Sequence, residues 1–198
     1  GRIEEGYDIM TLMTERIRSL VLDVLYYAKE RALALETLDV RSFVDDAAFV
    51  VTPKARKHRI DFECRFDDDL GRLEADPVAL RSAVVNILEN AVEACLEDKD
   101  GGGHRIVFGA RGDARQLELE VRDNGAGMDE ETRKNLFNLF FSSKGPQGTG
   151  LGLFIARRTI EQHGGRIRVV SEPGQGACFS IVLPRTAPQP EVAAETTT

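Results

Sequence analysis

The residues best suited to chemistry gather in three short stretches of this 198-residue chain, and a glycine-rich stretch is the most prominent. Four glycines fall within residues 145–152, and an apolar helical pattern follows directly. A glycine loop that leads into a helix presents unpaired backbone N–H groups and the positive end of the helix dipole, which together suit phosphate. The stretch does not fit a Walker phosphate loop, because Lys144 precedes the glycines instead of following them. By itself it predicts either a phosphate-binding loop or a plain turn.

The other two stretches offer a pair of amides and an acid. Asn86 and Asn90 lie one turn apart on a predicted helix and therefore share one of its faces. Asparagine is unfavourable inside a helix, so this pair indicates a polar cleft beside the helix. Asp123 ends a predicted strand and is followed by a turn that contains Gly125 and Gly127. A carboxylate in this position can reach into a cleft without obstruction from neighbouring side chains.

Composition limits the classes of function. The net charge is −7 and the pI is about 5.1, which disfavours a nucleic-acid partner held by charge. The three cysteines, Cys64, Cys95 and Cys178, lie far apart and lack the spacing of a metal site. Such isolated thiols fit a reducing compartment, so we expect a cytoplasmic location. The sequence has no apolar run of membrane-spanning length, and any membrane anchor of the parent protein would lie outside this piece.

Hydrophobic periodicity predicts the elements that must position these residues. A heptad pattern predicts one long helix over residues 7–35, which either packs against partner helices of the parent or another subunit, or folds back on its own domain. Further helices are predicted over residues 41–57, 76–98, 130–135 and 150–163, and strands over residues 35–40, 60–66, 72–75, 105–111, 116–122, 166–171 and 177–183. This order predicts an α/β two-layer sandwich with a mixed, mainly antiparallel sheet and helices on one face.

The chain divides into three predicted parts. Residues 1–36 hold the long helix, and residues 37–184 form the compact domain with the three stretches. Residues 185–198 are rich in small residues, proline and threonine, which predicts a disordered tail.

In chain order, the motifs resemble the catalytic ATP-binding domain of bacterial sensor histidine kinases. The resemblance covers residues 38–184. Its motifs are an N box at Asn86-Ile87-Leu88-Glu89-Asn90-Ala91, a first glycine box at Asp123-Asn124-Gly125-Ala126-Gly127, an F box at Phe137-Asn138-Leu139-Phe140-Phe141, and a second glycine box at Gly148-Thr149-Gly150-Leu151-Gly152-Leu153. The resemblance implies the Bergerat-type fold that these kinases share with gyrase, the mismatch-repair ATPase and a heat-shock chaperone. Residues 1–36 resemble the second helix of the kinase dimerisation bundle, truncated at its start.

The resemblance implies a site for ATP and Mg²⁺. Asn90 would give its amide oxygen to Mg²⁺, and Asn86 would lie beside it near the phosphates. Asp123 would accept a hydrogen bond from the adenine amino group. Lys144 would follow the phosphates as a point charge in a mobile lid. The remaining implied contacts come from Gly125, Gly127 and Met128 around adenine, and from backbone N–H groups of Gly148, Thr149, Gly150, Leu151 and Gly152 at the phosphates.

The resemblance also implies partners. These are a phosphoacceptor histidine on a helix of the parent, the receiver domain of a response regulator, and a second copy of the parent joined through the N-terminal helix. Acceptor histidines of this family are followed by an acid, whereas His58, His104 and His163 are followed by arginine, arginine and glycine. We interpret all three as structural or exposed. We therefore expect this chain to be a fragment that binds ATP without phosphorylating itself.

One departure from the family pattern and several alternatives stay open. The family's last box places a threonine before a phenylalanine to support the adenine-binding acid, and Cys178 stands there, so we expect support through water. A gyrase-like ATPase would need a glutamate where Asn86 stands. Glu89 either assists proton transfer or only stabilises its helix. A serine kinase of the anti-sigma type and a non-catalytic dimer scaffold are the remaining alternatives.

The second glycine box leads to an expectation about substitutions. Gly150→Val and Gly152→Val should each weaken ATP binding while leaving the fold intact, because a side chain would block the approach of the phosphates. An unchanged affinity would mean that the stretch is only a turn.

Overall fold

The computed structural model describes residues 33–98, 102–142 and 150–187. Most of the helix predicted over residues 7–35, with its proposed role in dimerisation, lies outside these residues. Residues 33–35 are described and form no helix, so the predicted helix end at residue 35 is wrong. The reason is a long-range contact, since the backbone N–H of Ala34 donates to the Asp76 carboxylate instead of to a helical carbonyl. The first strand begins at Glu36, one residue before the predicted start of the domain.

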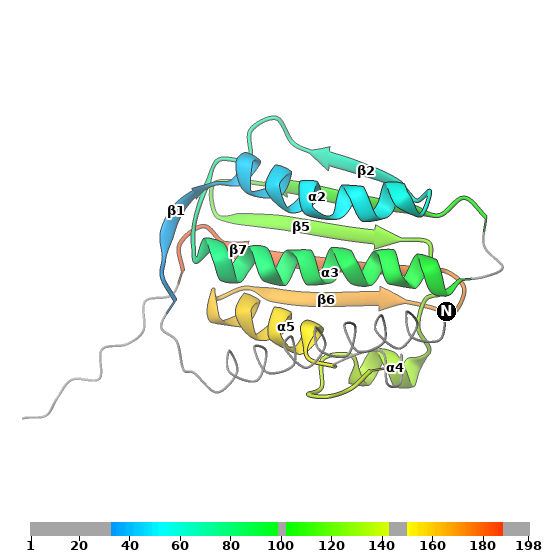
Figure 1. The fold of residues 1–198 in the computed structure, drawn as a ribbon. Coiled ribbons are helices and arrows are strands. Elements are labelled where there is room, and N and C mark those ends of the chain that lie inside the picture. The colour runs from blue at the N-terminus through cyan, green and yellow to red at the C-terminus, as the bar shows by residue number, and fades with distance from the viewer. Residues whose placement is uncertain (1–32, 99–101, 143–149, 188–198) are drawn as a thin grey trace, which may run out of the picture.

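A five-stranded sheet forms the back layer of the fold (Figure 1). Its strands lie in the order β2 (Asp61–Phe66), β4 (Arg105–Gly112), β5 (Gln116–Asp123), β7 (Ala177–Pro184) and β6 (Arg166–Ser171). β2 pairs with β4 in parallel, and the other neighbours in this sheet pair antiparallel. The prediction of a mixed, mainly antiparallel sheet is therefore confirmed.

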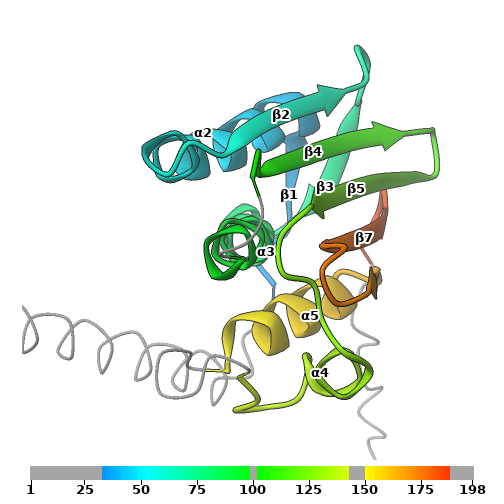
Figure 2. The same cartoon turned by 90° about the vertical axis from the view of Figure 1, so that its right-hand side faces the viewer.

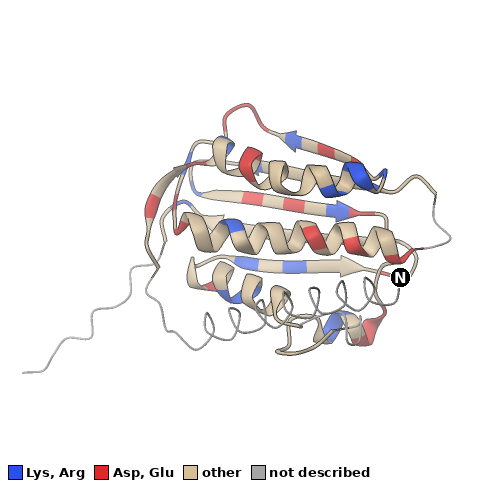
Figure 3. Ribbon diagram, in the orientation of Figure 1, with Lys and Arg blue, Asp and Glu red and all other residues tan. Residues whose placement is uncertain are grey.

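Helices cover one face of this sheet (Figures 1 and 2). They are α2 (Val40–Lys57), α3 (Pro77–Glu97) and α5 (Gly152–Gln162), with the short α4 (Glu130–Asn135) beyond α5. Along β5, charged residues alternate with apolar ones (Figure 3), and the apolar Leu117, Leu119 and Val121 are buried in the core. The two-layer α/β sandwich is thus confirmed. No helix in the described part of the chain is long and apolar enough to cross a membrane.

A small second sheet joins the start of the domain to the start of α3. β1 (Glu36–Asp39) pairs antiparallel with β3 (Arg72–Ala75), separately from the main sheet. Ala75 is followed at once by Asp76, whose side chain caps α3 by accepting from the N–H groups of Val78 and Ala79. The predicted strand over residues 35–40 is therefore present, and its partner holds it beside the first turn of α3.

The bounds of α5 show why predicted and observed helix ends differ. The pattern predicts a helix over residues 150–163, whereas α5 covers Gly152–Gln162. Gly150 has a φ of +65°, which belongs to the left-handed region and cannot continue a right-handed helix. At the other end His163 is the C-cap, and Gly164 follows with a φ of +72°. Apolar periodicity locates the body of a helix but does not detect these changes in backbone conformation.

Three residues of the predicted disordered tail, residues 185–187, are instead part of the fold. Arg185 continues the pairing at the edge, since its N–H donates to Arg115 and its carbonyl accepts from the N–H of Glu74. Its guanidinium donates to three backbone carbonyls, those of Leu70 (2.7 Å), Arg72 (3.2 Å) and Asp113 (2.9 Å). Composition predicts disorder here because it does not reveal such carbonyl partners. The rest of the tail lies outside the described residues.

We expect Arg185→Ala to lower the free energy of unfolding by about 1–3 kcal/mol, because it leaves carbonyls from two separate turns without their charged donor. Arg166→Ala is the matched control, since it removes an exposed arginine from β6 and should cost no more than about 0.5 kcal/mol. Denaturant unfolding of both variants measures the difference. Equal effects of the two substitutions would contradict the conclusion that the hydrogen bonds of the Arg185 guanidinium stabilise the fold.

Candidate functional site

The amide pair on α3 lies beside the start of α5. Asn90 donates from Nδ2 to the carbonyl of Asn86 at 2.7 Å, which fixes the plane of the Asn90 amide. A Cβ added at Gly152 would lie 3.6–3.8 Å from the amide atoms of the Asn86 side chain. The first residue of α5 therefore contacts Asn86 directly. That Asn86 and Asn90 face one polar cleft stays a prediction, and the structure shows that Gly152 of the second glycine box lies beside Asn86.

The start of α5 has the properties of an anion-binding helix end. Its N-cap residue is Leu151, which supplies no side-chain hydrogen bond to the first turn. The backbone before it is tied in place, because the N–H of Phe140 donates to the carbonyl of Gly150 at 3.1 Å. Leu151 itself is buried, and its carbonyl accepts from the N–H of Ile155. The positive, N-terminal end of this 11-residue helix therefore points toward Asn86.

The two glycines of this loop differ in what they tolerate. Gly150 combines its positive φ with backbone contact, since an added Cβ would collide with the backbone of Phe140. Any side chain at Gly150 therefore strains the fold itself, and the expectation that Gly150→Val leaves the fold intact is wrong. At Gly152 an added Cβ meets only Asn86, at ordinary contact distance. Gly152→Ala is thus the substitution that tests binding without disturbing the backbone.

Asp123 is the buried acid of the site. It ends β5 with 4% of its surface exposed. Its Oδ1 accepts from the N–H of Gly125 at 2.9 Å and from the N–H of Ala177 at 3.3 Å. Its Oδ2 is equally buried and has no hydrogen-bond partner among the described residues. Burial raises the pKa of Asp123, and the two backbone donors only partly oppose this rise.

The turn after Asp123 is wedged between α3 and the β6–β7 connection. An added Cβ at Gly125 would collide with the backbone of Ala94, and the N–H of Ala126 donates to the Ala94 carbonyl at 3.1 Å. Gly127 has a φ of +66° and contacts the carbonyl of Glu172 in the same way. Both glycines are therefore required by close backbone approach, with or without a ligand. Met128 follows and packs partly buried against the core.

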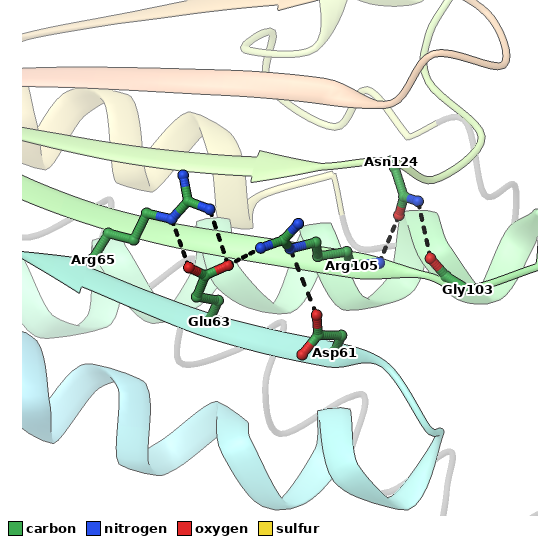
Figure 4. A network of polar contacts seen from close by, with 6 residues as sticks. All are labelled: Asp61, Glu63, Arg65, Gly103, Arg105 and Asn124. Carbon is green, nitrogen blue, oxygen red and sulfur yellow. Dashed lines mark hydrogen bonds and ion pairs between the residues drawn. The ribbon is translucent and has the colours of Figure 1, made fainter.

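Asn124 anchors this turn to the neighbouring strand (Figure 4). Its Oδ1 accepts from the N–H of Arg105 at 2.7 Å, and its Nδ2 donates to the carbonyl of Gly103 at 3.2 Å. The side chain of Arg105 in turn pairs with Glu63, which also accepts from Arg65 at 2.7 Å. The hydrogen bond from Arg65 and then that from Arg105 lower the pKa of Glu63 to about 2. This surface network fixes the parallel edge of the sheet from which the turn departs.

The expected support of Asp123 by Cys178 is wrong. Cys178 pairs across from Arg122, and burial followed by the nearby charge of Glu120 raises the pKa of its thiol. It therefore lies on the charged face of the sheet, opposite the face of Asp123. Successive strand residues point to opposite faces, and Ala177 is the one that meets Asp123, through its backbone N–H. Counting in steps of two from the buried Phe179 would have placed Ala177 correctly.

Four of the predicted site residues lie on or against α3. Gly152 contacts α3 at Asn86, and Gly125 contacts it at Ala94, with Asn90 midway. At 1.5 Å per residue this row is about 12 Å long. The roles expected of Lys144, Gly148 and Thr149 lie outside the described residues.

The histidines agree with their structural interpretation. His58 is exposed at the C-terminus of α2. His104 is partly buried, and its backbone carbonyl accepts from the N–H of Asp61. His163 is almost completely buried and hydrogen-bonded at both ring nitrogens. Its contact with the first turn of α3 was not predicted from the sequence.

Comparison with known proteins adds independent information. Residues 75–187 match the family described as histidine kinase-, DNA gyrase B-, and HSP90-like ATPase. The chain is 32% identical over 181 residues to the signal transduction histidine-protein kinase AtoS of Escherichia coli (strain K12), covering 91% of this chain and 29% of AtoS. It is also 32% identical over 188 residues to sporulation kinase E of Bacillus subtilis (strain 168), covering 93% of this chain and 25% of that kinase. The chain thus spans less than a third of either relative.

Solved structures show the same likeness. The catalytic domain of histidine kinase ThkA superposes with a TM-score of 0.66 at 28% identity, covering 77% of this chain and 98% of that domain. ThkA in complex with the response regulator protein TrrA gives a TM-score of 0.73 at 27% identity, covering 90% of this chain and 50% of ThkA.

We expect Asp123→Asn to raise the melting temperature at neutral pH. The pKa of Asp123 is raised on folding, so its contribution to stability is complete below the ordinary pKa of aspartate and is lost as the pH rises through the folded value. At neutral pH the buried charge therefore destabilises the fold, and the neutral amide removes it. The gain should shrink toward zero in acid.

Asp113→Asn serves as the control of opposite sign. Backbone hydrogen bonds from Arg115 and Gln116 lower the pKa of Asp113, so its carboxylate stabilises the fold above its unfolded pKa and loses this effect in acid. Thermal unfolding of both variants across pH measures the two trends. A lower melting temperature for Asp123→Asn at neutral pH would contradict the burial argument.

Proposed function

Because this chain belongs to the histidine kinase-, DNA gyrase B- and HSP90-like ATPase family, we propose that it is the ATP-binding catalytic domain of a two-component sensor histidine kinase. Its likeness to AtoS and sporulation kinase E supports the kinase class within this family. The domain would hold Mg-ATP and present the γ-phosphoryl group to a histidine on another segment of the parent protein.

The buried Oδ2 of Asp123 is the observation that supports this proposal most directly. A buried carboxylate oxygen without a donor is costly and requires an explanation. The exocyclic amino group of adenine is a donor of the right kind, whereas guanine offers a carbonyl oxygen at the equivalent position. An acid held in this way selects adenine over guanine. We assign contacts with the adenine ring to Gly127, in the same turn, and to Met128, which follows it.

The start of α5 suits the phosphates of the same ligand. Its first turn brings the positive end of the helix dipole beside Asn86. We assign phosphate contacts to the backbone of Gly150, Leu151 and Gly152. Lys144, Gly148 and Thr149 extend this assignment by family resemblance into residues that the structure does not describe.

Asn90 is the proposed ligand of Mg²⁺. Magnesium takes oxygen ligands and keeps several waters and substrate phosphates in its shell, so one amide oxygen from the protein suffices. The bond from Asn90 Nδ2 to the Asn86 carbonyl turns the amide nitrogen toward its own helix and so orients the amide oxygen. When bound, the ion neutralises charge on the phosphates during transfer.

Catalysis by this domain would consist of positioning. In phosphoryl transfer the protein contributes orientation and charge stabilisation rather than covalent chemistry. Asp123 orients the base, while Asn86 and the start of α5 orient the phosphates, so that the terminal phosphoryl group faces outward. The acceptor histidine belongs to another helix of the parent. The likeness to ThkA, which was solved in complex with a response regulator protein, supports a receiver domain as the next partner. Homodimerisation through residues 1–36 is part of the same proposal.

The gyrase-like alternative has less support from this chain. Hydrolysis needs a base that activates water, and the position where those ATPases place a glutamate is the amide Asn86. Asn86 is partly buried against Gly152, and an amide cannot act as that base.

We expect the chain to bind Mg-ATP, and Asp123→Asn to weaken that binding about 10- to 150-fold, because the amide NH₂ faces the adenine amino group where an acceptor is required. Asn90→Ala should remove only the part of the affinity that depends on Mg²⁺. In EDTA, therefore, the wild type and Asn90→Ala should bind ATP with the same affinity. Isothermal titration measures both effects. Asp113→Asn is the control, and undiminished ATP binding by Asp123→Asn would refute the adenine assignment.

We also expect no self-phosphorylation. Incubation with γ-labelled ATP should leave the chain unlabelled, whereas a separate helical hairpin with a histidine followed by an acid should acquire acid-labile label. Label on the chain itself would contradict the structural interpretation of its histidines. Steady release of phosphate that Asn86→Ala abolishes would favour the gyrase-like alternative.

A further inference from the structure

A buried histidine joins the ends of the two helices that form the proposed nucleotide site. His163, at the C-terminus of α5, is 2% exposed. Its Nε2 lies 2.9 Å from the backbone nitrogen of Asp76, and its Nδ1 lies 2.7 Å from the carbonyl oxygen of Thr159. A backbone amide can only donate, so Nε2 is the unprotonated acceptor and Nδ1 holds the proton. These two contacts therefore select one tautomer of the imidazole.

Asp76 extends this junction to the segment that enters the domain. Its Oδ1 caps α3, while its Oδ2 accepts from the N–H of Ala34 at 3.1 Å. Burial raises the pKa of Asp76, but the backbone donors at Ala79, Ala34 and Val78 outweigh this effect and hold the pKa below its usual value. The ionised carboxylate thus binds the chain just before β1. The pairing of Glu36 with Ala75 fixes the same segment from the other side.

The junction lies at the far end of the helix pair from the nucleotide site. α3 and α5 run antiparallel, since the end of α5 meets the start of α3 at His163, and the start of α5 meets Asn86 at Gly152. The two contacts are about 15 Å apart along each helix. Together they set the longitudinal register of one helix against the other. Apolar packing alone would leave that register less strictly defined, because dispersion contacts have no required direction.

We propose that His163 and Asp76 are positioning residues that fix α5 against α3 and connect both helices to the segment at Ala34. This inference rests on the proposed function, since the register matters because it places the start of α5 over Asn86 for the phosphates. A displacement of the chain at Ala34 then reaches α3 through the side chain of Asp76. It reaches α5 through the side chain of His163, which accepts from the backbone N–H of Asp76. Neither residue contacts the nucleotide.

Paired substitutions in the 198-residue chain test the two links separately. His163→Gln keeps an acceptor near the position of Nε2, whereas His163→Leu keeps bulk without an acceptor. Asp76→Asn keeps the oxygen that caps α3, and Asn is as good an N-cap as Asp, but its NH₂ faces the N–H of Ala34. Mg-ATP affinity by calorimetry and amide hydrogen exchange by mass spectrometry are measured for each variant.

We expect His163→Leu to weaken Mg-ATP binding about 5- to 20-fold and to speed exchange in the first turn of α5, while unfolding stays cooperative. His163→Gln should stay within about twofold of the wild type in both measurements. Asp76→Asn should retain the affinity within about twofold and speed exchange at Ala34 and β1 about tenfold. If His163 had a purely structural role, His163→Leu would lower the melting temperature and leave the affinity unchanged, and that result would overturn the proposal, as would equal damage from His163→Gln and His163→Leu. For Asp76→Asn, unchanged exchange at Ala34 and β1 would overturn the link to the entering segment.

The wild-type protein provides a measurement that needs no variant. Nitrogen-15 shifts of the His163 ring should show protonated Nδ1 and unprotonated Nε2 near neutral pH. The opposite tautomer would overturn the proposal even if His163→Leu fails to fold. Failure of the proposed function and failure of the junction give different results. If the wild type does not bind Mg-ATP, the proposed function is refuted. The tautomer of His163 and the amide exchange at Ala34 test the His163–Asp76 junction in either case.

Discussion

A carboxylate oxygen buried without a donor is the constraint on which the proposed site depends. The backbone satisfies one oxygen of Asp123 through Gly125 and Ala177 and leaves the other for a group from outside the described residues. This arrangement costs stability in the free protein, because burial opposes the charge. It also prepares a strong acceptor, whose desolvation is complete before a ligand arrives. Instability of the free domain and selectivity for an amino group are therefore two results of the same burial.

The surrounding backbone is packed so closely that glycine is required for reasons of folding as well as binding. Gly125 lies against Ala94, Gly127 against Glu172, and Gly150 against Phe140. These contacts bring the acid-bearing turn and the start of α5 against opposite ends of one stretch of α3. The glycines of these boxes therefore serve both the packing of the backbone and the proposed binding of the nucleotide, and a sequence pattern does not separate the two roles. Among the glycines of the two boxes that the structure describes, Gly152 alone lies where an added Cβ would meet a side chain at ordinary contact distance.

Much of the fold and of the site could be predicted from sequence because its signals are local. The predicted strands over residues 116–122 and 177–183 match β5 and β7 to within one residue, and the helix predicted over residues 76–98 matches α3 equally well. The spacing of Asn86 and Asn90 predicted a shared helix face. The predictions failed where a distant group or a change in backbone conformation decides the outcome. Arg185 is ordered by carbonyls from other turns, and residues 33–35 leave the helical pattern because the Asp76 side chain takes the N–H of Ala34. Gly150 delays the start of α5 because its φ is positive.

The sequence by itself determined the residue types, their order and therefore the family to which the chain belongs. The tertiary structure decided which atoms meet. It showed that Ala177, and not Cys178, supports Asp123, because strand alternation turns Cys178 to the opposite face. It also placed His163 against Asp76, 87 residues away in the chain. Contacts between distant residues depend on the packing of α5 against α3 and on the path of the sheet. Local periodicity does not encode these, because each local pattern is compatible with more than one partner.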